Sequence, residues 1–213
     1  LNPQAMMYDK PMSFDDYLSS KYVVEPLRLP DNCLVNDGGR AVIVTTLERA
    51  RDLKHRPAVI LGLGQHNPSV QVTQSGILTG STGARKACET ALSIAGITRD
   101  DIDACQIYDC FTYTVELTLQ DYGFFEPGEG ESWFSGGTTG PGGRMPVNTS
   151  GGQLSEAYYM GLTPLSEAAM QIMGRCGDRQ LGPATQTKEP NIILVSDNGG
   201  ILQTHSCCIL GRI

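Results

Sequence analysis

The sequence lacks long hydrophobic runs and has no surplus of basic side chains. No stretch approaches the ~20 apolar residues that a membrane-spanning helix needs, so we expect no membrane as a partner. The chain carries 16 Lys and Arg against 23 Asp and Glu, which gives a formal net charge of -7. A protein whose main task is to neutralise phosphates carries the opposite balance, so no nucleic acid is expected as a partner either.

Metal-binding patterns are missing as well. The cysteines include no pair at the C-x-x-C spacing of zinc sites and thioredoxin-like redox pairs; they are Cys33, Cys88, Cys105, Cys110, Cys176, Cys207 and Cys208. The three histidines, His55, His66 and His205, are too few and too scattered to suggest a metal site. The sequence therefore predicts no metal.

A secretory leader is not visible. The chain opens with Leu1 and Asn2 rather than with Met, and its first residues show neither a basic segment nor an apolar signal core. The odd number of scattered cysteines is typical of reduced, intracellular proteins. We therefore expect a cytoplasmic protein whose biological start is not residue 1.

The residues that are present indicate a globular α/β protein. The chain has 213 residues, 40% of them hydrophobic, with 25 Gly and 12 Pro, which suits a buried core and many tight turns. Strand patterns lie at 41–45, 58–63, 104–107, 192–195 and 206–210; helix patterns follow Ser13 and lie at 47–53, 83–95, 112–122 and 165–173; residues 126–152 are rich in Gly and irregular. This alternation predicts a mixed sheet covered by helices.

Two tyrosines stand where ligands often bind. Tyr108 lies where a predicted strand gives way to a helix, and open α/β sheets bind ligands at such strand ends. Tyr158 follows the glycine pair Gly151 and Gly152. Spacing alone favours packing roles for both tyrosines. Of the histidines, only His66, in a polar loop at a strand end, is a candidate for binding a substrate, and the other two are expected to be structural.

Four segments resemble motifs of one protein family. Residues 37–42, Asp-Gly-Gly-Arg-Ala-Val, resemble an Asp-Gly-Ala-x-Ala segment, and residues 108–111, Tyr-Asp-Cys-Phe, resemble Asn-Glu-Ala-Phe and, more closely, His-Asp-Cys-Phe. Residues 148–152 resemble an Asn-x-x-Gly-Gly that precedes a catalytic Gly-His-Pro, and residues 197–200 fall where a Cys-x-Gly is found. From Asn36 onwards the chain thus resembles the C-terminal part of the thiolase superfamily, in particular the thiolase-like lipid-transfer proteins related to sterol carrier protein X.

This resemblance implies a layered α-β-α-β-α fold, of which the chain supplies the C-terminal half. Residues 1–36 would end a loop or insertion region, residues 37–57 would form the last strand and helix of the N-terminal thiolase domain, and residues 58–213 would form the C-terminal thiolase domain. A homodimer is implied by the family only. A C-terminal half by itself would expose a broad apolar face.

The departures from the thiolase motifs point to a different reaction. Tyr158 stands near the place of the thiolase histidine, Tyr108 replaces the asparagine, and the cysteine of Cys-x-Gly is absent. A pair of tyrosines is similar to the thiolase-like aldolases that shorten steroid side chains. These lyases cleave a β-hydroxyacyl-CoA by a retro-aldol reaction into a ketone and a shorter acyl-CoA such as propionyl-CoA, with an OB-fold partner protein and no cofactor besides the CoA thioester substrate.

The resemblance also assigns roles to residues. Tyr108 and Tyr158 would carry the proton transfers, without a choice between base and acid. Backbone amides around Gly151 and Gly152, and around Gly199 and Gly200, would stabilise the enolate. Asn198 and Asp109 are further candidates for substrate binding, beside His66 from its polar loop. Asp109 either orients the neighbourhood of Tyr108 or caps a helix.

Two rival functions stay open at this point. The protein could be an acyl-CoA acyltransferase or thiolase that uses a cysteine upstream of this sequence. It could also be a non-catalytic thiolase-like subunit that binds lipids or acyl-CoA. Release of a ketone from a hydroxyacyl-CoA distinguishes the aldolase from both.

Overall fold

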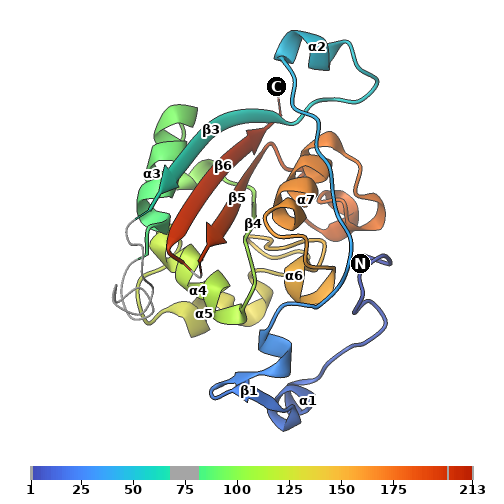
Figure 1. The fold of residues 1–213 in the computed structure, drawn as a ribbon. Coiled ribbons are helices and arrows are strands. Elements are labelled where there is room, and N and C mark those ends of the chain that lie inside the picture. Colours follow the sequence, from blue (N-terminus) through green and yellow to red (C-terminus); the bar gives the residue numbers. More distant parts are fainter. Residues whose placement is uncertain (1, 68–81, 201, 213) are drawn as a thin grey trace.

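The computed structural model describes residues 2–67, 82–200 and 202–212. In this part of the chain the main sheet has four strands, β3 (Val59–His66), β6 (Thr204–Gly211), β5 (Ile192–Gly199) and β4 (Ala104–Gln106), in that order (Figure 1). The strand β6 pairs antiparallel with both β3 and β5, whereas β4 runs parallel to β5. The mixed sheet predicted from the sequence is confirmed.

Helices cover both faces of this sheet. The helices α3 (Ala84–Ala95) and α4 (Thr112–Asp121) lie on one side, and α7 (Leu162–Met173) lies on the other (Figure 1). Buried residues of α7, among them Ala168 and Ile172, pack with Ile193 and Val195 of β5. The three helices predicted at 83–95, 112–122 and 165–173 are confirmed, and α7 begins three residues earlier than the pattern indicated.

The contact between α3 and β3 explains a glycine pair in the sequence. A side chain at Gly62 would collide with the backbone carbonyl of Ala91, and one at Gly64 would collide with that of Ala87. The helix presents Ala87 and Ala91, both fully buried, to the strand. The glycines therefore let a helix lie close to a strand.

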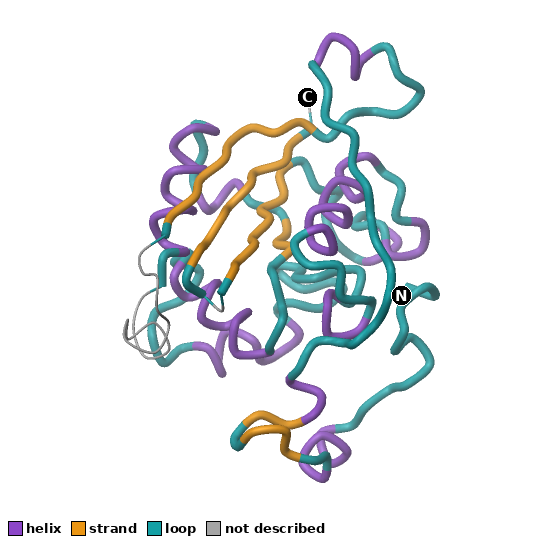
Figure 2. Tube along the Cα trace, in the orientation of Figure 1, coloured by secondary structure: helices purple, strands orange, loops and turns teal. Residues whose placement is uncertain are grey.

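Shorter elements surround this core. A small lobe near the N-terminus contains α1 (Phe14–Ser19), which Ser13 caps, and a hairpin of β1 (Tyr22–Val24) and β2 (Leu27–Arg28) (Figure 2). The Gly-rich region predicted to be irregular contains the short helix α5 (Gly130–Phe134), and α6 (Gly152–Ser155) begins at its end. Single turns of 3-10 helix lie at Leu29–Asp31, Arg99–Asp101, Ser135–Gly137, Gly177–Arg179 and Pro183–Thr185.

The strand predicted at 41–45 is wrong. Residues 41–45 form an unpaired segment that leads to α2 (Leu47–Arg51), and the side chains of Ile43 and Val44 are 92% and 76% exposed. A β-branched run favours a strand only where a neighbouring strand and a packed surface receive it, and the described part of the structure offers this run neither. The helix predicted after it is confirmed, two residues shorter than expected.

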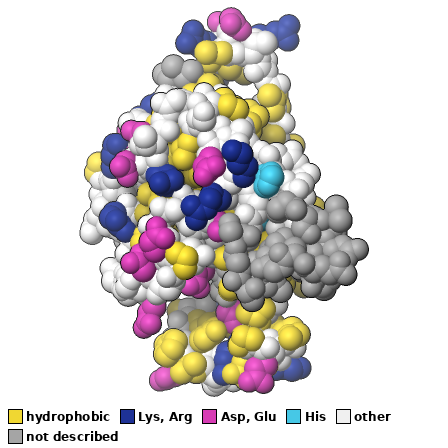
Figure 3. All heavy atoms as spheres, turned by 90° about the vertical axis from the view of Figure 1, so that its left-hand side faces the viewer, with side chains coloured by type: hydrophobic (Ala, Val, Ile, Leu, Met, Phe, Trp, Pro, Cys, Tyr) yellow, Lys and Arg dark blue, Asp and Glu magenta, His cyan; other side chains and the backbone are white. Residues whose placement is uncertain are grey.

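Apolar side chains are also exposed on β3 and on the small lobe. On β3, Ile60 and Leu63 are about half exposed, because α7 covers the sheet near β5 and does not reach β3. On the small lobe, Phe14 and Val24 are 72% and 70% exposed. Figure 3 shows hydrophobic side chains gathered on this lobe and charged ones over the α3 side.

None of the helices within residues 2–67, 82–200 and 202–212 combines the length and the apolar character that crossing a bilayer requires.

Candidate active site

The two tyrosines singled out in the sequence meet in the structure. Their hydroxyl oxygens lie 2.7 Å apart and share a hydrogen bond, although the residues are separated by 50 positions in the chain. The rings of Tyr108 and Tyr158 meet edge to face, with centroids 6.3 Å apart. The structure thus joins the two phenols in one site, as a shared proton-transfer role requires.

The two phenols differ in their access to solvent. Tyr108 is only 7% exposed, whereas Tyr158 is partly exposed. Burial, and then the hydrogen bond to Tyr158, raise the pKa of Tyr108 well above that of a free tyrosine. This environment favours the neutral phenol of Tyr108, and Tyr158 is the more exposed of the two residues.

Tyr108 is held through the backbone at the end of β4. The parallel pairing of β4 with β5 places Gln106 opposite Val195, and two residues later the N–H of Tyr108 donates to Oγ of Ser196 at 3.1 Å. On the other side of the chain, the hydroxyl of Thr114 in α4 donates to the carbonyl of Tyr108 at 3.3 Å. Sheet and helix together therefore fix the position of this tyrosine.

Asp109 joins the loop of Tyr108 to α6. Its buried carboxylate accepts hydrogen bonds from the N–H of Gln153 at 2.8 Å and from the N–H of Leu154 at 3.3 Å. Asp109 therefore caps α6 rather than the helix that follows it in the chain. Burial raises the pKa of Asp109 to about 6, against the lowering effect of these N–H donors.

Gly151 and Gly152 shape the turn that brings α6 against Asp109. Both have positive φ angles, of 104° and 60°, and a side chain at Gly152 would collide with the carboxylate of Asp109. Their amides already donate within the chain, Gly151 to the carbonyl of Asn148 at 2.9 Å and Gly152 to Oγ of Ser150 at 3.3 Å. The turn thus accounts for both glycines, and their role in substrate binding stays a prediction.

The other predicted binding residues lie at the same end of the sheet. Asn198 and Gly199 end β5, and Gly200 follows in the turn. Oδ1 of Asn198 accepts from the N–H of Leu202 at 3.4 Å. His66 is exposed at the end of β3, three strand positions from β4, which corresponds to roughly 14 Å. The structure therefore does not bring His66 to the tyrosine pair.

His205 is structural, as the sequence suggested. It is fully buried, and Nε2 lies 3.1 Å from the carbonyl oxygen of Leu202. Burial lowers the pKa of His205 to about 4, so the imidazole is neutral at physiological pH.

Two residues near the tyrosine pair, Asn36 and Asp197, were not predicted as site residues from the sequence. The side chain of Asn36 holds the backbone of Tyr158, with Oδ1 accepting from its N–H at 2.7 Å. Asp197 lines a cavity of about 250 Å³ together with Gly161, Leu162 and Ser206, and its charge contributes to the raised pKa of Tyr108. The sequence noted Asp197 only as replacing a cysteine, and no local pattern marked Asn36.

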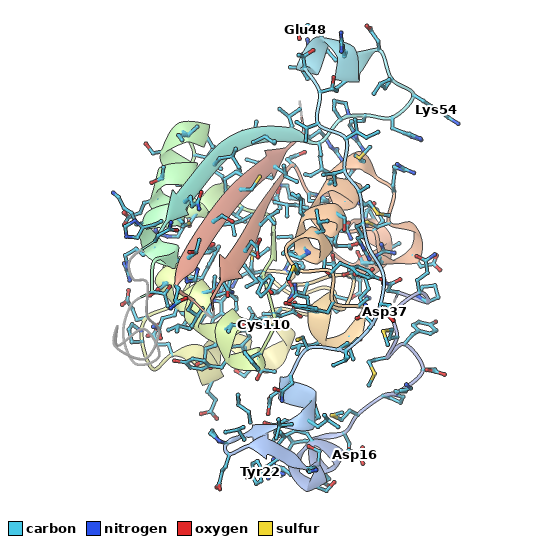
Figure 4. The ribbon with its side chains drawn as sticks, viewed as in Figure 1. Asp16, Tyr22, Asp37, Glu48, Lys54 and Cys110 are labelled. Carbon is cyan, nitrogen blue, oxygen red and sulfur yellow. The ribbon has the colours of Figure 1, made fainter. Side chains whose placement is uncertain are left out.

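Labelled side chains locate these segments in Figure 4. Cys110, two residues beyond Tyr108, lies on the loop ahead of α4, and Asp37 lies on the extended segment that passes α6. Burial raises the pKa of Cys110 to about 11, so this thiol is not an activated nucleophile.

Comparison with known proteins gives a consistent result. Residues 64–212 match the family model described as thiolase C-terminal domain-like. A steroid side-chain-cleaving aldolase of Thermomonospora curvata is 37% identical over 177 residues, which are 81% of this chain and 45% of that protein. The 17-hydroxy-3-oxo-4-pregnene-20-carboxyl-CoA lyase of Mycobacterium tuberculosis is also 37% identical over 177 residues, covering 81% of this chain and 46% of that protein.

A solved structure resembles the whole chain. The Ltp2-ChsH2(DUF35) aldolase superposes with a TM-score of 0.87 at 33% sequence identity, covering 99% of this chain and 54% of that one. The present chain spans about half the length of the curated relatives it matches.

Proposed function

Because the chain belongs to the thiolase C-terminal domain-like family, we propose that it carries the tyrosine pair of a thiolase-like aldolase that cleaves a β-hydroxyacyl-CoA into a ketone and a shorter acyl-CoA. The observation that carries this proposal is the 2.7 Å hydrogen bond between the hydroxyls of Tyr108 and Tyr158. The two relatives that share 37% of their aligned residues with this chain are named as an aldolase and a CoA lyase, which supports the same reaction.

A retro-aldol cleavage needs only proton transfers around the bond that breaks. The β-hydroxyl loses its proton as its oxygen forms the ketone, and the electrons of the carbon–carbon bond pass to the thioester as an enolate. The α-carbon then takes up a proton, so the reaction consumes and releases no net proton. Neither a covalent nucleophile nor a redox step is required.

A pair of neutral phenols suits this balance. Each hydroxyl can accept one proton while it passes on another, so the pair can relay the β-hydroxyl proton towards the enolate carbon. The buried environment of Tyr108 favours the neutral phenol over the phenolate. Tyr108 would therefore relay a proton rather than act as a phenolate base. The more exposed Tyr158 would contact the substrate first.

The substrate and partners follow from the relatives. We propose a steroid side-chain CoA ester as the substrate, which the names of the two curated relatives support. The family resemblance adds propionyl-CoA as the shorter product. We also propose that the protein works in the cytoplasm as a homodimer with an OB-fold partner. The two-part name of the Ltp2-ChsH2(DUF35) aldolase supports a partner protein. Asp197, beside a cavity of about 250 Å³ near Tyr108, is a candidate contact for the acyl chain or the thioester.

The test is direct detection of products. The full-length protein, with its OB-fold partner, is incubated with a panel of acyl-CoA and β-hydroxyacyl-CoA esters, and ketone, free CoA and acyl-CoA are followed by mass spectrometry. Equal amounts of ketone and shorter acyl-CoA from a hydroxyacyl-CoA support the aldolase. Free CoA or acyl transfer without ketone supports the acyltransferase, and binding without turnover supports a non-catalytic subunit.

A further inference from the structure

An extended segment crosses the loop that carries Tyr158. Residues 36–40, which we call the strap, form neither helix nor strand and run past α6 and α7 (Figure 1). The loop they cross, residues 156–161, is also irregular apart from an isolated bridge between Tyr159 and Gly161, and it contains Met160 with a φ of 53°. No regular strand ladder therefore fixes Tyr158 in the described structure, and other contacts have to hold it.

Asn36 supplies two of those contacts. Its Oδ1 accepts from the N–H of Tyr158 at 2.7 Å, and its Nδ2 donates to the carbonyl of Tyr158 at 3.4 Å. One amide side chain thus binds both backbone groups of a single residue, as a neighbouring strand would. This arrangement fixes the peptide from which the Tyr158 ring projects.

The rest of the strap contacts the residues on either side of Tyr158. Arg40 forms an ion pair with Glu156, donates to Oγ of Ser166 at 2.6 Å and lies 5.3 Å from the ring centroid of Tyr159. Gly38 lies directly against the same ring and has no room for a side chain. Within the strap, these contacts hold the neighbours of Tyr158, whereas Asn36 holds Tyr158 itself.

We propose that Asn36 is the positioning residue of Tyr158, which keeps its hydroxyl within hydrogen-bonding distance of Tyr108 and of the substrate; this inference rests on the proposed aldolase function. A reacting group displaced by about 1 Å can lower a rate by about 100-fold. Loss of Asn36 therefore lowers the rate of the chemical step more than it weakens substrate binding.

The experiment is a double-mutant cycle in the full-length protein with its OB-fold partner. Asn36→Ala is expected to lower kcat on a hydroxyacyl-CoA by about 10- to 100-fold with KM changed by less than about threefold. Asn36→Asp, which keeps an acceptor for the N–H of Tyr158 and loses the donor to its carbonyl, is expected to give a smaller loss. Asp37→Ala, at the exposed neighbouring position, serves as the matched control and should match the wild type.

The cycle separates positioning from a general structural role. If Asn36 acts through the Tyr158 hydroxyl, Asn36→Ala should cause little further loss in a protein that already carries Tyr158→Phe. Equal losses in both backgrounds, or wild-type kcat in Asn36→Ala, would overturn the inference. A Tyr158→Phe protein with normal turnover would instead overturn the proposed function. Should Asn36→Ala fail to fold, Asn36→Asp takes its place in the same cycle.

Discussion

The carboxylate of Asp109 accepts the N–H of Gln153 at 2.8 Å, which ties the residue after one tyrosine to the helix that leads to the other. Asp109 and Gln153 are 44 positions apart in the chain. This connection gives the tyrosine pair a defined spacing, and it makes a buried carboxyl group part of the support of the site.

Both tyrosine hydroxyls should be needed for turnover. Tyr158→Phe and Tyr108→Phe are each expected to lower kcat on a hydroxyacyl-CoA by about 100-fold or more, because each removes one member of the proton relay. Steady-state kinetics of ketone release measures this, and circular dichroism checks the fold. Tyr8→Phe, at an exposed position, is the matched control. Normal kcat in either site variant would remove that residue from the mechanism.

Asp109 should make the protein more stable in mild acid. Its pKa is about 6 in the folded protein against 3.8 in a free chain, so the folded state binds more protons between these values. The contribution to stability is present below pH 4 and falls by roughly 3 kcal/mol as the pH rises past 6.

Urea unfolding of wild type and Asp109→Asn between pH 4 and 7 measures this contribution. The difference in unfolding free energy, wild type minus variant, should decrease with rising pH, since all other titrating groups cancel. A difference that is constant over this range would contradict the prediction.

His205 should act in the opposite direction. Burial lowers its pKa from 6.5 to about 4, so the unfolded chain binds more protons in this range than the folded protein does. Stability from the neutral imidazole is complete above pH 6.5 and is lost by roughly 3 kcal/mol as the pH falls to 4. The urea concentration at the midpoint of unfolding should therefore change less between pH 6.5 and 4 in His205→Gln than in the wild type. The same change in both proteins would contradict the prediction that the buried imidazole resists protonation.

Gly64 should tolerate no side chain. Gly64→Ala is expected to lower the free energy of unfolding by about 1 to 3 kcal/mol, because the added methyl group would collide with the carbonyl of Ala87 and push α3 away from β3. Thermal and urea denaturation measure the change. Gly39→Ala is the control, since nothing lies within 4 Å of a side chain at that position. Equal stability of the two variants would mean that the helix moves without cost.

Local sequence patterns predicted the helices and strands whose apolar side chains pack into the core. The helix α3 was visible because its apolar residues recur at helical spacing, and β5 and β6 were visible as short apolar runs. The run at 41–45 misled for a physical reason: its side chains have strand character, but strand formation depends on a partner that the local sequence does not reveal. The tyrosines were identified by family resemblance, because spacing alone favoured packing roles.

The supports of the site could not be predicted in the same way. The contact of Asn36 with Tyr158 joins residues 122 positions apart, and only the folded backbone brings them together. The amides of Gly151 and Gly152 donate hydrogen bonds within the turn, which the motif did not reveal, and their role towards a substrate stays a prediction. A motif reports which residue types are present, and it does not report which of their hydrogen-bonding groups are already occupied.

The hydrogen bond from Tyr108 to Ser196 spans 88 positions, and that from Tyr158 to Asn36 spans 122. Each contact closes a long loop of chain, so the pair can assemble only after the ends of the sequence have come together. The geometry of the tyrosine pair therefore depends on contacts between distant parts of the chain, whereas the helical signal depends on contacts within each helix. Activity should consequently fade at lower denaturant than the helical signal does.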